Sequence, residues 1–159
     1  MSVEMVREYL KCFDLCDRVM EFEISSATVD LAAVAVGTEP ARIAKSLTFY
    51  GKDGDCLMIV TAGDQKIDNS KFKAQFGCKA RMMSAEDAQS FTGHAGGGVC
   101  TFALPESGVQ VFLDGSLRRF DVVYPAAGSS NSAVRLSCEE LERATGGATW
   151  TDVCKSREA

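Results

Sequence analysis

The tightest constraint on the fold comes from two runs of strand-type residues on either side of Gly51-Lys52-Asp53-Gly54. Ala44–Tyr50 is rich in apolar, aromatic and β-branched residues, and Cys56–Thr61 in apolar and β-branched ones. Two such runs joined by a short glycine-containing loop are typical of a β-hairpin. We therefore expect these runs to pair as neighbouring strands.

Predicted helices and further strands are distributed irregularly around this hairpin. Helical spacing of apolar residues from Val6 to Phe13 predicts an opening helix. Further helix starts are expected at the capping residues Ser26, Asn69, Ser84 and Ser137, and at Thr38-Glu39-Pro40. Further strands are expected at Met20–Ser25, Val109–Leu113, Asp121–Tyr124, Ala133–Leu136 and Ala148–Val153. This order favours a mixed α+β fold over a doubly wound parallel sheet.

The length of 159 residues fits a single domain over residues 1–159, because two halves would each bury too little apolar surface. The contents of hydrophobic (46%) and charged (25%) residues argue against a disordered chain. No apolar run approaches the roughly 20 residues of a membrane span. The charged N-terminus lacks the apolar segment of a signal peptide. We therefore expect a cytoplasmic protein with no membrane partner.

The cysteines and histidines argue against a metal site. Seven cysteines are spread along the chain, and an odd number is unlike a disulfide framework, so free thiols in a reducing compartment are expected. Cys12 and Cys16 are close in sequence but lack a second pair or a nearby histidine to complete a zinc site. With His94 as the single histidine, we expect no metal and no cofactor.

The acidity of the chain limits its possible partners. A net charge of −5 counts against a protein that binds long stretches of nucleic acid, and DNA is therefore not an expected partner.

Lys45 is the first candidate for chemistry. The two-residue period of a strand places Lys45, Leu47 and Phe49 on one side of the predicted strand. An ammonium on this more apolar side needs an anionic partner or a wet cleft. The alternative is a lysine at the start of a strand whose amine extends to solvent.

The second candidate is the segment from Gly93 to Cys100, which contains three consecutive glycines. Backbone N–H groups in such a segment can approach an oxyanion or a phosphate closely, although the segment matches neither a P-loop nor a dinucleotide fingerprint. A plain connection between a helix and a strand is the alternative. His94 and Cys100 also suggest a nucleophile pair, but apolar residues follow Cys100 and favour a structural cysteine.

The third candidate is the loop of small residues from Ala126 to Asn131. Small side chains leave room for a substrate and the serine hydroxyls can bind one, whereas a plain turn explains the same residues.

Taken in order, several short motifs resemble those of one family. They are Ala41-Arg42-Ile43-Ala44-Lys45-Ser46-Leu47, Val60-Thr61-Ala62-Gly63-Asp64, Thr92-Gly93-His94, Gly97-Gly98-Val99, Leu117-Arg118-Arg119-Phe120-Asp121 and Ala126-Ala127-Gly128-Ser129. From about residue 20 to 154 the chain resembles the YbaK-type aminoacyl-tRNA deacylases. These are free-standing relatives of the editing domain inserted in bacterial prolyl-tRNA synthetase.

The resemblance implies a fold and an activity. The fold is a compact α+β domain with a curved, mainly antiparallel central sheet flanked by helices. The activity is hydrolysis in trans of the ester that joins a wrong amino acid, such as cysteine or alanine, to tRNA for proline. Mischarged tRNA is the implied partner, and prolyl-tRNA synthetase is a candidate protein partner.

The resemblance also implies the site residues. The essential lysine of the family falls on Lys45, and we expect it to be catalytic by holding a phosphate of the terminal adenosine. The implied substrate-binding residues are Ser46, Gly97, Gly98, Val99, Thr101, Ala127, Gly128 and Ser129. Thr101 departs from the family pattern, which has proline there; threonine adds an N–H and a hydroxyl to the loop.

No side chain stands out as a general base, so the hypothesis is ester hydrolysis assisted by groups of the substrate. Two alternatives are a non-catalytic module that binds aminoacyl-tRNA or a synthetase, and a thiol enzyme that uses Cys100 with His94. An enzyme that reads only the acceptor end needs few phosphate contacts. The candidate cations for these contacts are Lys45, Lys66, Lys71, Lys73, Arg118 and Arg119.

Overall fold

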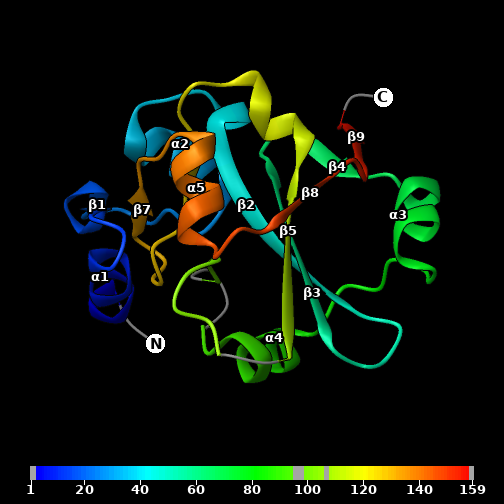
Figure 1. Ribbon diagram of the computed structural model, residues 1–159. Helices are drawn as coiled ribbons and strands as arrows, with labels where there is room; N and C mark the ends of the chain where they lie inside the picture. Colours follow the sequence, from blue (N-terminus) through cyan, green and yellow to red (C-terminus); the bar gives the residue numbers. More distant parts are fainter. Residues whose placement is uncertain (1–2, 95–98, 106–107, 158–159) are drawn as a thin grey trace.

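A mixed five-stranded sheet forms the centre of the protein (Figure 1). The computed structural model describes residues 3–94, 99–105 and 108–157, and the strand order is β6-β2-β3-β5-β8. The strands of this sheet are β2 (Ile43–Tyr50), β3 (Cys56–Ala62), β5 (Val109–Asp114), β6 (Tyr124–Pro125) and β8 (Thr149–Thr151). The predicted α+β class is therefore confirmed.

The hairpin that the sequence predicts is the longest antiparallel ladder of the sheet. β2 and β3 pair from Ala44 opposite Ala62 to Tyr50 opposite Cys56. The turn closes through the Gly51 N–H, which donates to the Asp55 carbonyl over 2.7 Å, and Gly54 takes a φ of 84° that favours glycine.

The remaining pairings of this sheet are parallel, which corrects the mainly antiparallel sheet that the resemblance implies. β6 pairs with β2, β5 with β3 and β8 with β5, each in parallel register. Parallel neighbours need a crossover between them. The long segments of chain between β3 and β5, and between β5 and β8, supply these crossovers and carry helices.

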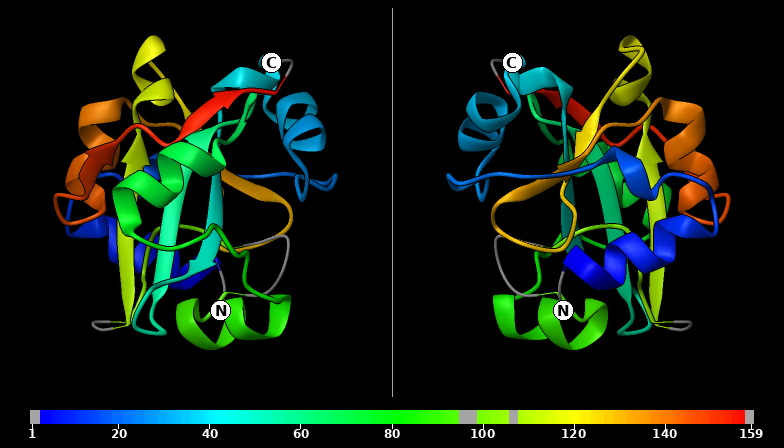
Figure 2. Two further views of the ribbon diagram at one scale, coloured as in Figure 1. Left: turned by 90° about the vertical axis from the view of Figure 1, so that its right-hand side faces the viewer. Right: turned by 90° about the vertical axis from the view of Figure 1, so that its left-hand side faces the viewer.

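Two small antiparallel sheets complete the strands. The first consists of β1 (Val19–Glu21) and β7 (Ser132–Val134), so the predicted strand Met20–Ser25 is shorter and begins one residue earlier. The second consists of β4 (Gln65–Ile67) and β9 (Cys154–Ser156), near the C-terminus (Figures 1 and 2).

The helices begin close to the predicted positions. They are α1 (Val3–Lys11), α2 (Val29–Val36), α3 (Asn69–Phe76), α4 (Ala85–Thr92) and α5 (Cys138–Ala144). Ser84 and Ser137 are N-caps as predicted, and Ser137 forms a full capping box with Glu140. Two caps differ: Thr28 rather than Ser26 caps α2, and Asp68 rather than Asn69 caps α3. The start predicted at Thr38-Glu39-Pro40 is a single 3-10 turn, Pro40–Arg42.

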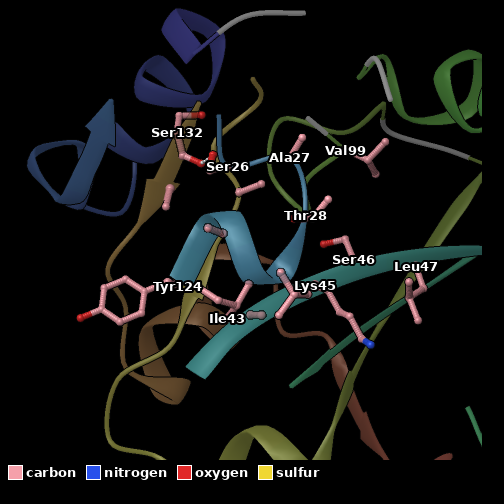
Figure 3. Close-up of a pocket in the computed structure, with 15 residues that line it drawn as sticks. Ser26, Ala27, Thr28, Ile43, Lys45, Ser46, Leu47, Val99, Tyr124 and Ser132 are labelled. Carbon is pink, nitrogen blue, oxygen red and sulfur yellow. Dashed lines mark hydrogen bonds between the residues drawn. The ribbon is translucent and has the colours of Figure 1, made fainter. Parts of the chain in front are cut away.

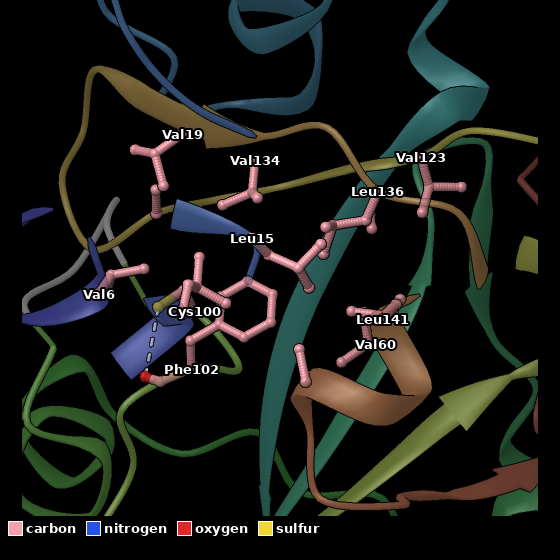
Figure 4. Close-up of a cluster of buried hydrophobic side chains, with 14 of the residues drawn as sticks. Val6, Leu15, Val19, Val60, Cys100, Phe102, Val123, Val134, Leu136 and Leu141 are labelled. Atoms are coloured by element: carbon pink, nitrogen blue, oxygen red, sulfur yellow. Dashed lines mark hydrogen bonds between the residues drawn. The ribbon is translucent and has the colours of Figure 1, made fainter. Parts of the chain in front are cut away.

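The two faces of the sheet pack against different helices. On one face, Met58 and Val60 of β3 belong to a core with Leu10 of α1 and Leu141 of α5, part of which Figure 4 shows. On the other face, aromatic rings from the sheet and α3 pack against one another at tilted angles, with 5.1 Å between the ring centroids of Phe49 and Phe72. Adjacent residues of β3 therefore belong to two separate cores, with Leu57 and Ile59 in the second.

None of the helices within the described ranges is long and apolar enough to cross a membrane.

Candidate functional site

The outer edge of β2 is interrupted around Ser46. At one end, β2 pairs with β6 at Ile43 and Ala44; at the other, the Met83 N–H donates to the Thr48 carbonyl over 2.9 Å. Because backbone groups of alternate residues point to the same edge, the N–H and C=O of Ser46 also point there. No strand among the described residues pairs with this edge at Ser46. The interruption leaves room for a ligand beside the sheet.

A cavity of about 280 Å³ lies at this interruption (Figure 3). Its walls come from β2, from the chain entering α2, and from the region of β6 and β7. The lining residues are Ser26, Ala27, Thr28, Val29, Ala32, Ile43, Ala44, Lys45, Ser46, Leu47, Val99, Tyr124, Ala126, Ser132 and Ala133. Small and apolar side chains with several hydroxyls thus surround the space, as is typical of a small-molecule site.

Ser46 contributes a hydroxyl without a partner. Its Oγ atom is buried and has no hydrogen-bond partner in the structure. A buried hydroxyl normally has a partner, and leaving one unpaired is unfavourable. Figure 3 shows Ser46 and Lys45 pointing to opposite sides of the β2 ribbon. The position of Ser46 in the cavity wall makes it available to a bound polar group.

Lys45 is one of the lining residues, while its ammonium reaches the first residue of β4, Gln65. Nζ donates to the Gln65 carbonyl over 2.5 Å. Burial lowers the pKa of the Lys45 ammonium below its ordinary 10.5, and the neighbouring Arg157 guanidinium lowers it further. The sequence predicts that this ammonium needs an anionic partner or a wet cleft. The structure places it half-buried beside a cavity, but its hydrogen-bond partner is a neutral carbonyl rather than an anion.

The predicted loop of small residues borders the cavity through its first residue only. Ala126 lines the space, whereas Ala127 is fully buried in the core. Gly128 has a φ of 95°, which explains a glycine there. Ser129 lies behind the wall, with its Oγ atom 2.8 Å from Oγ of Ser132, a lining residue. Ala127, Gly128 and Ser129 therefore support the wall rather than form its surface.

The predicted glycine loop contributes Val99 to the cavity. Gly97 and Gly98 lie outside the described residues. Thr101 is buried with its Oγ1 atom unpartnered and is absent from the cavity lining. The loop thus approaches the cavity at Val99 and then enters the core at Thr101.

Comparisons with known proteins identify the family. The model of the aminoacyl-tRNA editing domain matches residues 25–144, a range that includes every lining residue of the cavity. This chain belongs to the aminoacyl-tRNA editing domain family. The expected resemblance is confirmed.

Individual relatives agree with this membership. YwhH, an uncharacterized protein of Bacillus subtilis (strain 168), is 47% identical over 99% of this chain and 100% of its own length. A proline--tRNA ligase of Limosilactobacillus fermentum is 30% identical over 96 residues, covering 57% of this chain and 17% of that enzyme. The crystal structure of a candidate trans-editing enzyme for prolyl tRNA synthetase superimposes with a TM-score of 0.86 at 28% identity, over 98% of this chain and 99% of the other.

The editing-domain cavity contains hydroxyls that sequence reasoning did not single out as site residues. Ser26 and Thr28 from the chain before α2, Tyr124 from β6 and Ser132 from β7 meet only in the folded chain. In the sequence, these residues lie in segments rich in small and polar side chains. Ordinary turns and helix caps have the same composition, so it did not identify a site. Lys45 and Tyr124 are the titratable side chains among the described lining residues.

Cys100 and His94 are brought together away from the cavity. Sγ of Cys100 lies 3.3 Å from Nε2 of His94, and Phe102 provides a carbonyl 2.8 Å from the same nitrogen. Both side chains are fully buried, and burial raises the pKa of the Cys100 thiol to about 12. A thiolate nucleophile needs the opposite shift and access to substrate, so this pair fits a structural role.

The remaining thiols and acids form no metal centre within the part of the chain that the structure describes. No group of three or more His, Cys, Asp or Glu side chains is placed to hold a metal ion there, and all seven cysteines are free.

Proposed function

We propose that this protein hydrolyses the ester of mischarged aminoacyl-tRNA in trans, acting on tRNA for proline that carries a small wrong amino acid such as alanine or cysteine. The observation that carries the proposal is the unpartnered Ser46 hydroxyl in a small cavity whose lining also includes Lys45. Family membership and the likeness to proline--tRNA ligase support the reaction and the tRNA. We propose the cytoplasm as the place of action.

The size of the cavity supports a small aminoacyl group as its occupant. Its volume of about 280 Å³ lies near the lower end of ligand pockets, which span roughly 300–1,000 Å³. The apolar residues Val29, Ile43 and Leu47 in its lining suit a methyl or thiol side chain. The ribose and phosphate of the terminal adenosine would then lie at the rim, near Lys45.

The reaction is addition of water to the ester carbonyl carbon. The bond between that carbon and the ribose oxygen breaks, and the ribose oxygen takes a proton, so the products are a free amino acid and intact tRNA. In the proposed role, Lys45 holds a phosphate of the terminal nucleotide and Ser46 hydrogen-bonds the aminoacyl group. Because the described lining contains no carboxylate or imidazole, the substrate supplies part of the activation of water.

A binding module without turnover is the second candidate. Its support is the contact of the Lys45 ammonium with the Gln65 carbonyl, on the other face of β2 from the Ser46 hydroxyl, together with Thr101 in place of the family proline. In this version the cavity would recognise charged tRNA for a prolyl-tRNA synthetase.

A panel of mischarged tRNAs separates the two candidates. Purified protein is incubated with tRNA for proline charged with alanine, cysteine, serine or proline, and free amino acid is measured against time. Accelerated release from at least one mischarged tRNA, with prolyl-tRNA spared, is expected. Tight binding of a charged tRNA with no release above the spontaneous rate would favour the binding module and exclude the hydrolase.

A further inference from the structure

The open edge of β2 presents the backbone groups of one residue to the cavity. Ala44 pairs with β6 on one side of the interruption, and the Thr48 carbonyl accepts the Met83 N–H on the other. At a rise of about 3.3 Å per residue, these two pairings lie about 13 Å apart along β2. Ser46 is at the centre of this gap, where no backbone group of the described residues pairs with its N–H or C=O. The gap therefore offers one donor and one acceptor side by side.

An aminoacyl group carries the same two functions as one residue of a β-strand. Its α-ammonium donates hydrogen bonds, and its ester carbonyl accepts them. In an antiparallel ladder, two residues of a hydrogen-bonded pair exchange both N–H···O=C bonds. An extended aminoacyl group opposite Ser46 can therefore form both bonds. The Ser46 C=O accepts from the α-ammonium, and the Ser46 N–H donates to the ester carbonyl oxygen.

The antiparallel orientation also determines where the two ends of the substrate lie. A segment that runs opposite to β2 places the group after its carbonyl beside the preceding residue of β2, which is Lys45. The ester oxygen and the ribose therefore lie toward Lys45, and the α-ammonium lies toward Leu47, away from the Lys45 cation. This orientation agrees with the proposed role of Lys45 as the partner of a terminal phosphate.

The same pairing directs the side chain of the substrate. Residues that face each other in an antiparallel pair place their side chains on the same face of the sheet. Thr28 and Val99 of the cavity lining lie on the side of the β2 ribbon to which Ser46 points, as Figure 3 shows. An L-aminoacyl side chain therefore enters the cavity beside the unpartnered Ser46 hydroxyl, whereas a D-aminoacyl side chain points to the opposite face.

We propose that the backbone of Ser46 recognises the aminoacyl group by pairing with it as a strand residue does. The proposal rests on the proposed function for the identity of the ester. It assigns the ligand class as esters of small L-α-amino acids with a free α-ammonium. When water adds to the ester carbonyl carbon, negative charge develops on the carbonyl oxygen. The Ser46 N–H is directed at this oxygen and stabilises the charge.

The first test varies the ligand and needs no turnover. tRNA for proline that ends in 3′-amino-3′-deoxyadenosine is acylated through a stable amide with L-alanine, with D-alanine or with propionate, which lacks the α-amino group. Binding is measured by fluorescence anisotropy, with the unacylated tRNA as the reference.

The L-alanyl form is expected to bind most tightly. Loss of a hydrogen bond to a charged group should weaken binding of the propionyl form roughly 10- to 100-fold. The D-alanyl form loses the burial of its methyl group in the cavity and should bind at least roughly threefold more weakly. Equal affinities for the three acylated forms, including the case in which none binds better than unacylated tRNA, would overturn the proposal.

The second test removes the Ser46 N–H and leaves every side chain in place. Replacing Ser46 with the corresponding α-hydroxy acid exchanges its backbone amide for an ester. The matched control is the same exchange at Thr48, whose backbone points to the same edge but which does not line the cavity. Each exchange weakens one carbonyl of the β2–β3 ladder, that of Lys45 or that of Leu47, so both should affect the fold equally. Circular dichroism and thermal unfolding establish that both proteins are folded, and the ligand series remains decisive where one is not.

The two backbone esters are expected to behave differently. The ester at Ser46 should bind the L-alanyl form roughly 2- to 10-fold more weakly, as for the loss of one hydrogen bond, and the ester at Thr48 should keep the wild-type affinity. Where the wild type releases amino acid, the ester at Ser46 should lose about 100-fold of the single-turnover rate, because it lacks an oxyanion donor. Equal affinity and rate in the two esters would overturn the proposal.

Failure of the proposed function gives a different result. A wild-type protein that prefers the L-alanyl form but releases no amino acid would support the pairing and exclude the hydrolase. An active hydrolase with equal affinity for the L-alanyl and propionyl forms would contradict the pairing and leave the hydrolase assignment intact.

Discussion

Lys45 and Ser46 are consecutive residues of β2, yet their side chains lie on opposite faces of the sheet. The Lys45 ammonium donates to the Gln65 carbonyl over 2.5 Å, whereas the Ser46 hydroxyl is buried at the cavity without a partner. Both residues line the cavity at the open edge of β2. The proposed function therefore requires a substrate that lies along this edge and contacts the hydroxyl on one side and the ammonium on the other.

Ser46→Ala is expected to stabilise the fold while it weakens function. Removing a buried hydroxyl that has no partner should raise the free energy of unfolding by about 1 kcal/mol, measured by urea denaturation. Loss of its hydrogen bond to substrate should lower kcat/KM by roughly tenfold. Ser132→Ala is the control, since the Ser132 hydroxyl already has a partner in Ser129 and its loss should destabilise the fold. A Ser46→Ala variant that is less stable and fully active would contradict the assignment.

Cys100→Ala is expected to retain the proposed deacylase activity. The thiol is fully buried, its pKa is raised to about 12 by burial, and it lies away from the cavity. Iodoacetamide should leave Cys100 unmodified in the native protein and should modify the exposed Cys12 first, as measured by mass spectrometry. Loss of turnover in a folded Cys100→Ala variant would instead favour the thiol enzyme.

The protein is expected to lose stability above pH 9. Burial raises the pKa of Cys56 to about 11 and of Cys100 and Cys154 to about 12, from 9.0. Above pH 9 these thiols ionise in the unfolded chain first, so the unfolded chain binds fewer protons than the native one and stability falls with pH. Each thiol contributes up to about 1.4 kcal/mol per pH unit between the two pKa values. Urea denaturation under reducing conditions at several pH values measures this slope, which Cys100→Ala should reduce; a slope unchanged by this substitution would contradict the account.

Local patterns predicted the parts of the fold that local chemistry controls. The β2–β3 hairpin, the Ser84 and Ser137 caps and the separation of Lys45 from Ser46 follow from turn residues, capping side chains and the two-residue period of a strand. The N-cap of α2 is two residues later than predicted because Ser26 and Thr28 are both good capping residues and only packing decides between them.

Features that depend on distant segments were not predictable in the same way. β4 has only three residues and pairs with β9, which lies almost 90 residues later, so no local periodicity indicates it. The predicted strand Ala148–Val153 ends at Thr151, and the Val153 N–H donates to the buried Asp114 carboxylate instead of continuing a ladder. Likewise, the motifs pointed to Lys45 and Val99, but Tyr124 and Ser132 reach the cavity only through the tertiary fold.

Deacylation of alanyl- and cysteinyl-tRNA for proline by wild type, Lys45→Ala and Lys45→Arg tests the central claim most directly. Under single-turnover conditions, wild type should release the amino acid far faster than the spontaneous rate, and Lys45→Ala should lose about 100-fold or more of that rate. Lys45→Arg keeps the positive charge and should recover part of the loss. Burial of the Lys45 ammonium is unfavourable, so Lys45→Ala is expected to stay folded. A loss of activity in this variant would therefore reflect the missing ammonium rather than unfolding. A wild-type protein that spares every mischarged tRNA, or a Lys45→Ala variant with full activity, would contradict the account.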